Sequence, residues 1–127
     1  MKNNNIWLML ILFLSAIFIN GGIAWANKSS AAIEVPESVS KATEITIRVT
    51  VTHSANNFLH YTKWVRVSAG DKEVARWDFT SSQRPEAAVF TKEIKYIVDG
   101  NVEIKAEASC NIHGGKEPAI VKVTVKE

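Results

Sequence analysis

A strict alternation of apolar and polar residues constrains the fold of this chain most. In residues 44–52 every second residue is Ile or Val, and the residues between them are Thr or Arg. The same alternation runs through residues 102–108 and 121–125. Successive side chains of a β-strand point to opposite faces of a sheet, so a period of two predicts strands with one buried and one exposed face.

Less regular apolar runs predict four further strands, at residues 33–35, 61–67, 74–79 and 90–98. Turn-forming residues separate these runs, and no segment shows the spacing of an amphipathic helix. About seven short strands in one domain predict an all-β fold, an immunoglobulin-like β-sandwich. A small barrel is the alternative. We expect Trp64 and Trp77 in the core of the sandwich, and Trp77 shares parity with Ala75 and Phe79.

The first 26 residues have the three parts of an export signal. Lys2 gives a positive start, residues 6–19 are apolar except for Ser15, and small residues flank Trp25 at Ala24 and Ala26. The apolar run is shorter than the ~20 residues that span a bilayer as a helix. We therefore expect cleavage after residue 26. The domain at 27–127 would then be periplasmic or extracellular, without a stable membrane anchor; an uncleaved anchor is the alternative.

The charge of the domain excludes several partners. Residues 27–127 carry 14 Lys and Arg against 13 Asp and Glu, with the signs interleaved. A nucleic-acid partner is therefore not expected. The chain also lacks a Gly-rich phosphate loop and a Gly-x-Ser-x-Gly motif, so nucleotide and hydrolase chemistry have no support.

The residues with metal-binding side chains occur in two short segments. His53 and His60 lie around one loop, and Cys110 and His113, the remaining members of these two residue types, lie around another. His53 continues the apolar face of residues 45–51, and Cys110 continues that of residues 102–108. Each side chain should point inward at the end of its strand. If both strands end at the same pole, the four side chains converge.

A set of imidazoles and one thiolate favours iron, zinc, copper or nickel over calcium or magnesium. A lone Cys is commonly a small buried apolar residue, and a His in a loop is commonly solvated. The joint occurrence of both types in two segments favours a metal site over these separate explanations.

Two sequence segments resemble the superoxide reductase, desulfoferrodoxin and neelaredoxin family. They are His-Ser-Ala-Asn-Asn-Phe-Leu-His-Tyr-Thr-Lys-Trp-Val, from His53, and Cys-Asn-Ile-His-Gly, from Cys110. The resemblance implies an immunoglobulin-like sandwich with one iron ion. It implies that His53, His60 and His113 are imidazole ligands and that Cys110 is the axial thiolate. Asn111 and nearby backbone amides would donate hydrogen bonds to the sulfur.

The chain departs from this family at one ligand. The family has a fourth equatorial His in a Glu-Lys-His segment near the start of the domain, and its Lys assists catalysis. This chain has no His before His53, and Lys28 is the basic residue of the corresponding segment. The resemblance therefore gives catalytic roles to Cys110 and Lys28, and it leaves one iron ligand to be supplied by water or by Lys28.

The leading hypothesis is an oxidoreductase of the superoxide reductase type. It would use iron to reduce superoxide to hydrogen peroxide and would need an external one-electron donor protein. A second hypothesis is a non-catalytic metal-binding module of the same fold, which holds iron, copper or zinc. A third is a structural interaction domain in which Cys110 and the His residues have no joint role.

Overall fold

Eight β-strands make up residues 28–127, the part of the chain that the computed structural model describes. They are β1 (Ser30–Glu34), β2 (Ser38–Ser40), β3 (Thr43–Thr52), β4 (Thr62–Ala69), β5 (Lys72–Asp78), β6 (Val89–Val98), β7 (Val102–Cys110) and β8 (Ala119–Lys126). Seven of them correspond to the predicted strands. The additional strand, β2, has three residues and only one apolar side chain, Val39, so alternation does not reveal it. The predicted signal lies outside the described residues.

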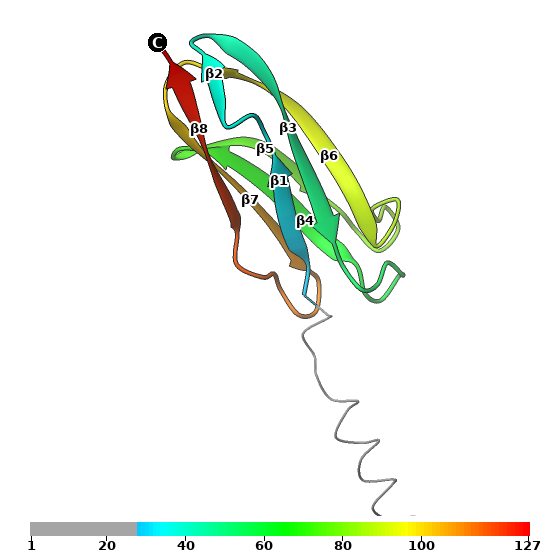
Figure 1. Cartoon of the computed structure of the whole chain (residues 1–127). Helices are drawn as coiled ribbons and strands as arrows, with labels where there is room; N and C mark the ends of the chain where they lie inside the picture. The colour runs from blue at the N-terminus through cyan, green and yellow to red at the C-terminus, as the bar shows by residue number, and fades with distance from the viewer. Residues whose placement is uncertain (1–27) are drawn as a thin grey trace, which may run out of the picture.

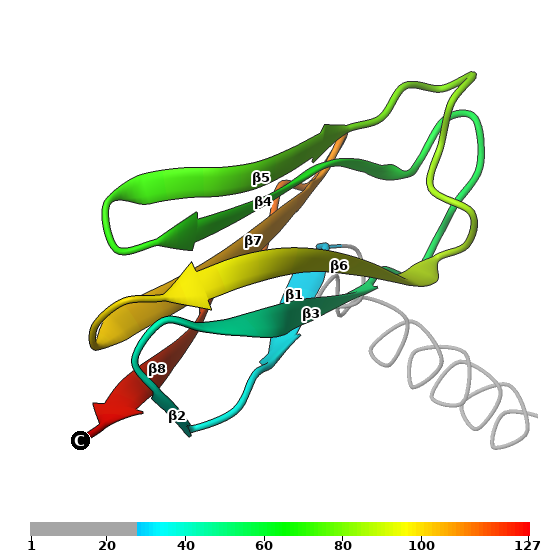
Figure 2. The same cartoon turned by 90° about the horizontal axis from the view of Figure 1, so that it is seen from above.

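The strands form two sheets that pack face to face (Figures 1 and 2). One sheet has the order β1-β3-β6, and the other has the order β2-β8-β7-β4-β5. All pairs are antiparallel except β2 and β8, which run parallel. This arrangement confirms the immunoglobulin-like β-sandwich, and the alternative of a small barrel is wrong.

The core lies between the sheets and is built from the predicted inward faces. In β3 the apolar residues of the alternation are buried, and Ile47, Val49 and Val51 have no exposed surface. Ile104 and Ala106 of β7 meet them from the other sheet, equally buried. Burial of each such side chain contributes about 1.5–3 kcal/mol relative to exposure, so this core is the main source of stability.

Three connections and the start of β1 meet at one end of the sandwich, which we call the loop pole (Figure 1). The connections are residues 53–61, 79–88 and 111–118. Backbone bonds link them: the amide of His53 donates to Ala88 O at 3.0 Å, and the amide of Asn111 donates to Tyr61 O at 3.0 Å. Ser29, just before β1, forms an isolated bridge with Gly115. The strand ends that carry the metal-binding residue types are therefore at one pole.

The prediction that Trp64 belongs to the core is wrong. Its half-exposed side chain lies on the outer face of β4. The Cζ atoms of Arg66 and Arg76 lie 5.1 Å and 5.3 Å from the centroid of its ring. Trp64 alternates with the buried Val65, so its side chain points to the outer face, as that of Arg66 does. The register shift between Thr62 and Trp64 in the pairing of β4 with β7 lets Thr62 be buried although it is only two residues away. Trp77, in contrast, packs partly buried against the core as predicted.

No helix within residues 28–127 is long and apolar enough to cross a membrane.

Candidate metal centre

Two of the candidate ligands are held by the strands themselves. His53 follows the last residue of β3, and Cys110 is the last residue of β7; each is 4% exposed. Both side chains continue the buried face of their strand, as the alternation predicts. The core therefore fixes the direction in which the imidazole and the thiol point.

The third candidate, His60, is positioned by a turn within the loop that follows β3. The Asn57 side-chain oxygen accepts hydrogen bonds from the amides of Leu59 and His60, both at 3.0 Å. The amide of Asn57 donates to His60 O at 2.9 Å, and the amide of His60 donates back at 3.2 Å. Asn favours such turns because its side chain can replace a backbone acceptor. The turn directs the half-buried His60 ring toward the end of β7.

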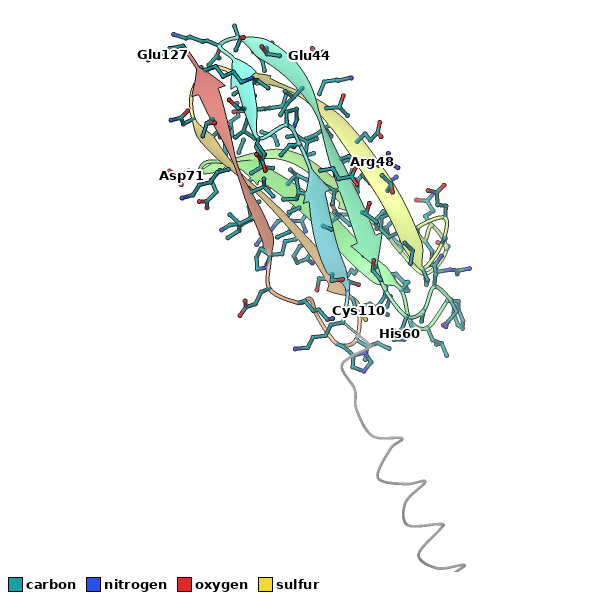
Figure 3. All side chains as sticks on the ribbon, viewed as in Figure 1. Glu44, Arg48, His60, Asp71, Cys110 and Glu127 are labelled. Carbon is teal, nitrogen blue, oxygen red and sulfur yellow. The ribbon has the colours of Figure 1, made fainter. Side chains whose placement is uncertain are left out.

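The ligand atoms of these residues lie close together at the loop pole (Figure 3 labels His60 and Cys110). His60 Nε2 is 3.1 Å from Cys110 Sγ. The ligand atoms of His53, His60 and Cys110 all lie within 4.8 Å of one another. The His53 and His60 rings meet edge to face, with centroids 4.6 Å apart. Three ligand atoms, from two segments that are distant in sequence, thus surround one point.

The fourth candidate, His113, closes the exposed side of the cluster. Its Nδ1 lies 3.3 Å from His60 Nε2 and 3.9 Å from Cys110 Sγ. Its side chain is exposed, unlike those of His53 and Cys110. The structure thus groups His53, His60 and Cys110, with His113 beside His60 and Cys110 on the solvent side.

The turn after β7 gives the sulfur two hydrogen-bond donors. The amides of Ile112 and His113 point to Cys110 Sγ at 3.4 and 3.5 Å, and the amide of Cys110 donates to Gly114 O at 2.8 Å. Gly114 has a φ of 75°, which a residue without Cβ adopts at little cost. A Cβ at Gly115 would clash with the carbonyl oxygen of Ala108. Both glycines are therefore needed to fold this turn against β7.

The Asn111 side chain makes different hydrogen bonds from the one expected. Its side chain does not donate to the sulfur: Nδ2 donates to Leu59 O at 3.0 Å, and Oδ1 accepts from the amide of Tyr61 at 3.0 Å and from Cys110 Sγ at 3.8 Å. The expectation was right for the backbone amides and wrong for this side chain. Asn111 instead ties the His60 loop to the Cys110 turn, on both sides of His60.

The segment before β1 also lies against the cluster. Ser29 is fully buried: its amide points to Gly114 O at 3.4 Å, and its carbonyl accepts from the amide of Lys116 at 2.9 Å. Ser29 Oγ lies 2.8 Å from Thr62 Oγ1, and Thr62 is the β4 partner of Cys110. Lys28 directly precedes Ser29 and therefore lies beside the Cys110 turn, and its side chain is exposed. Nothing in the sequence pattern predicts this contact between Ser29 and Thr62.

These residues fit a transition metal. Ligand atoms that share one ion through bonds of about 2.0–2.3 Å lie at most about 4.6 Å apart. The separations of 3.1, 3.3 and 3.9 Å among His60, His113 and Cys110 meet this limit, and the His53 group is close to it. Backbone amides that point at the sulfur suit a thiolate ligand. His53, His60, His113 and Cys110 are thus the residues that could hold an iron ion.

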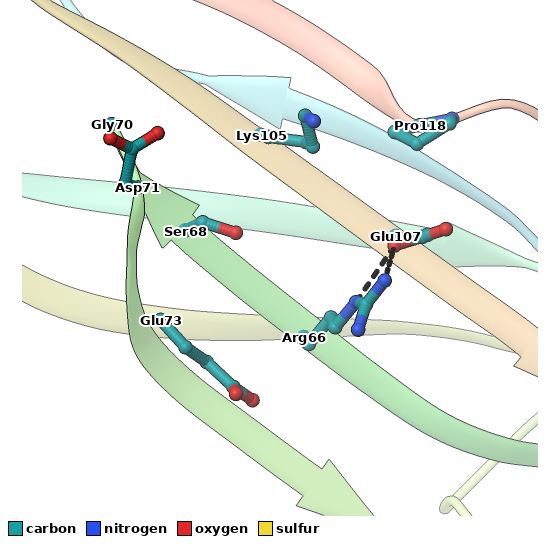
Figure 4. A pocket seen from close by; sticks show the side chains of 8 residues that line it. All are labelled: Arg66, Ser68, Gly70, Asp71, Glu73, Lys105, Glu107 and Pro118. Atoms are coloured by element: carbon teal, nitrogen blue, oxygen red, sulfur yellow. Dashed lines mark hydrogen bonds and ion pairs between the residues drawn. The ribbon is translucent and has the colours of Figure 1, made fainter.

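A separate hollow of about 440 Å³ lies on the outer face of the five-stranded sheet (Figure 4). Cations and carboxylates both line it, and Arg66 and Glu107 form an ion pair of 2.6 Å within it. It contains none of the candidate ligands. Because its lining mixes both signs of charge, it does not define a ligand class.

Comparison with known proteins agrees with the fold and the cluster. The family model described as desulfoferrodoxin matches residues 23–117, which include all four candidate ligands. A protein from Thermotoga maritima assigned as a superoxide reductase has 27% sequence identity and a TM-score of 0.60. The match covers 77% of this chain and 86% of that one.

Other similar structures share the fold. The superoxide reductase (neelaredoxin) of Ignicoccus hospitalis has 19% identity and a TM-score of 0.61, over 83% of this chain and 87% of that one. The sulfur carrier protein SoxY of Chlorobium limicola has 12% identity and a TM-score of 0.55, over 91% and 96%. No match was found among curated proteins. The SoxY likeness illustrates that function has to be argued from the site.

Proposed function

Since the chain belongs to the desulfoferrodoxin family, we propose that it is a mononuclear iron protein that reduces superoxide to hydrogen peroxide. One superoxide anion takes up one electron and two protons in this reaction. The observation that carries the proposal is the cluster of His53, His60 and Cys110, whose ligand atoms lie within 4.8 Å of one another, with His113 beside it. When bound there, iron supplies the electron through its ferrous and ferric states.

In this proposal the protein holds the metal and leaves one side of the cluster accessible to the substrate. The buried His53 and Cys110 fix the ligand set from the core, and the exposed His113 leaves that side of the cluster accessible to a small anion. The amides of Ile112 and His113 stabilise negative charge on the sulfur, and such hydrogen bonds tune the reduction potential of a thiolate-bound metal.

Lys28 has the charge and the place to assist the substrate. Its side chain is exposed, and the adjacent Ser29 is bound to the turn that carries Cys110 and His113. A cation near an open site attracts superoxide by electrostatic steering, an effect that salt weakens. In this proposal Lys28 raises the rate of encounter and donates a proton to the reduced substrate.

The second candidate function is a non-catalytic metal-binding module for iron, copper or zinc. One observation favours it: the segment in which the resemblance places the fourth His has no His in this chain, and the buried Ser29 of that segment is bound through its hydroxyl to Thr62. Three imidazoles and one thiolate are also a set that suits tetrahedral zinc, and affinity for divalent metals rises toward copper.

Pulsed superoxide decay separates the two functions. We expect a fast phase with the iron-loaded protein, and its loss in Cys110→Ser and His113→Ala. The variant Ile97→Thr, at an exposed position outside the loop pole, is the matched control and should retain the phase. For Lys28→Ala we expect a slower phase with a weaker dependence on salt, and recovery of the salt dependence with Lys28→Arg. Absence of a fast phase in the iron-loaded wild type would favour the metal-binding module.

We further propose that the domain is exported and acts in the periplasm or outside the cell. The support is the pattern of residues 1–26, which has a positive start, an apolar run and small residues before a cleavage point. The intact mass of the exported product should correspond to a chain that begins at Asn27. A product that keeps residues 1–26 and stays with the membrane fraction would contradict export by cleavage.

A further inference from the structure

The three most exposed large apolar side chains within residues 28–127 all lie at the loop pole. Leu59 is 67% exposed, Phe58 is 65% exposed and Ile112 is 59% exposed. Single exposed apolar residues are common on protein surfaces, but three at one end of a sandwich form a patch that points to an interaction surface. We call these three residues the apolar rim.

The backbone of the apolar rim is fixed by hydrogen bonds. Asn111 Nδ2 donates to Leu59 O at 3.0 Å, which joins the two loops, and Ile112 follows Asn111 directly in the chain. The amide of Leu59 donates to the Asn57 side chain at 3.0 Å. The two loops therefore present the rim as one surface, and a surface that is already ordered loses little conformational entropy on binding.

The charge around the apolar rim is positive, although the domain as a whole is nearly neutral. Apart from the candidate ligands, the charged side chains of residues 28–29, 53–63, 79–88 and 111–118 are all exposed; they are Lys28, Lys63, Arg84 and Lys116 against Glu86 and Glu117. Residues 27–127 carry 14 Lys and Arg against 13 Asp and Glu, so this excess of cations is local. Apolar side chains surrounded by cations are complementary to a bilayer with anionic headgroups.

The path of the chain favours a membrane over a protein as the partner. The described chain begins at the loop pole, where Lys28 precedes Ser29 and the backbone of Ser29 is bound to the turn after β7 (Figure 1). In the sequence, only the eight residues 20–27 separate Lys28 from the apolar run of residues 6–19. Eight residues span at most about 28 Å. In the proposed export, a bilayer that holds the apolar run therefore lies next to the apolar rim.

We propose that the apolar rim is a membrane-docking surface, which binds the interface of a bilayer that contains anionic phospholipid. Phe58, Leu59 and Ile112 enter the boundary between headgroups and acyl chains, and the cations around them contact lipid phosphates. The binding is reversible, because three side chains bury far less apolar surface than a spanning helix does. After cleavage it keeps the domain and its cluster at the membrane surface. The docking does not depend on the reaction proposed above, since no residue of the rim is a candidate ligand.

The test uses protein of residues 27–127, which include all eight strands and the buried core. Binding of the metal-free and zinc-loaded protein is measured by vesicle flotation, with vesicles of phosphatidylcholine alone and of phosphatidylcholine and phosphatidylglycerol in equal parts. The rim variant is Leu59→Gln/Ile112→Thr. Its matched control is Ile97→Thr/Ile120→Thr, at two 53%-exposed residues of β6 and β8.

A second pair of variants tests the cations. The charge variant is Lys63→Gln/Lys116→Gln, and its matched control is Lys72→Gln/Lys126→Gln, at exposed residues outside the loop pole. We expect the wild type to bind the vesicles that contain phosphatidylglycerol, and the rim variant to bind them at least about tenfold more weakly because its contact with the acyl boundary is lost. The charge variant should also bind more weakly, with a smaller dependence on salt. Both controls should bind as the wild type does.

The variant Phe58→Trp reports whether the rim itself enters the bilayer. Its emission should shift to the blue on vesicle binding and be quenched by lipids with brominated acyl chains. The wild type, whose Trp64 and Trp77 lie outside the rim, should show neither change. Absence of vesicle binding by the wild type, equal binding by the rim variant, or an unchanged emission of Phe58→Trp would overturn the proposal. Self-association without lipid that the rim variant abolishes, in place of vesicle binding, would assign the surface to a second copy and overturn it as well.

Discussion

His60 Nε2 lies 3.1 Å from Cys110 Sγ although the two residues are 50 positions apart in sequence. The contact depends on the pairing of β4 with β7, in which Thr62 is the partner of Cys110, and on the Asn57 turn that directs His60 back toward this pair. The register of one strand pair and the shape of one turn therefore decide whether a thiolate and an imidazole can share an ion.

The first prediction concerns the sulfur. Replacing Cys110 by Ser should abolish the sulfur-to-metal charge-transfer absorption of the Fe³⁺ or Co²⁺ protein and weaken metal binding by more than about 100-fold, because a thiolate ligand is lost. The control is Ser109→Ala, the neighbouring residue with a half-buried side chain, which should keep the absorption. Metal titration followed by absorption measures both effects. An unchanged spectrum of the Cys110→Ser protein would exclude sulfur ligation.

The second prediction concerns the link between the two ligand loops. Asn111→Ala removes the bonds to Leu59 O and from the amide of Tyr61, and should cost about 1–3 kcal/mol of unfolding free energy. It should also weaken metal binding about tenfold, since His60 is no longer held against the Cys110 turn. Urea unfolding and competitive metal titration measure the two effects.

The matched control for this prediction is Asn101→Ala. Asn101 accepts a hydrogen bond from the amide of Val125 at 2.7 Å, in the turn between β6 and β7 at the other end of the sandwich. It should destabilise the fold by a similar amount and leave metal binding unchanged. If both variants weaken metal binding equally, the effect of Asn111 is one of general stability.

The third prediction tests the close packing of the turn after β7, which carries His113 and Gly115, against the backbone of β7. Gly115→Ala should destabilise the domain by about 1–3 kcal/mol and weaken metal binding, because the added Cβ would clash with Ala108 O and displace the turn that carries His113. Gly100→Ala is the control, since a Cβ there meets nothing within 4 Å. Thermal unfolding with and without metal gives the result. A wild-type metal affinity in Gly115→Ala would show that the turn adjusts without moving its ligands.

Alternation predicts the buried ends of β3 and β7 well because both strands keep their register up to the cluster. His53 continues the face of Val51 and Cys110 that of Ala108, and all four side chains are buried. Their convergence at one pole additionally requires the topology, which the two segments alone leave open. The metal-ligand roles themselves stay predictions, as does the catalytic role of Lys28.

Sequence reasoning fails where residue type is given more weight than alternation, and where a contact is long-range. The large apolar ring of Trp64 predicts the core, but Trp64 alternates with the buried Val65 and Val67 and lies on the outer face. Asn111 was expected to donate to the sulfur, but only its oxygen faces Cys110 Sγ, and its Nδ2 donates to Leu59 O in a loop that is distant in sequence. The buried contact of Ser29 with Thr62 spans 33 positions and has no periodic signal. Long-range polar contacts of this kind depend on the folded backbone.

The last prediction asks whether the missing imidazole limits the site. Ser29 is fully buried, its amide points to Gly114 O, and its hydroxyl lies 2.8 Å from that of Thr62, the partner of Cys110. A His at position 29 would therefore lie beside the turn that carries Cys110 and His113, in the segment where the resemblance places a fourth imidazole. Because the site is packed, the variant Ser29→His/Thr62→Ala makes room for the ring, at a cost of about 1–3 kcal/mol in stability.

We expect this double variant to bind Fe²⁺ at least about tenfold more tightly than the wild type, since one more imidazole joins the ligand set. Its superoxide decay should also be faster at equal iron occupancy. The control Ser30→His/Thr62→Ala places the ring at the next residue of the chain. Ser30 pairs with Thr52 of β3 rather than with the turn after β7. This control should bind Fe²⁺ no more tightly than the wild type. Competitive titration against a chelator gives the affinities. Equal affinities in the two double variants would mean that position 29 does not face the metal, and the missing ligand would then have to come from water or Lys28.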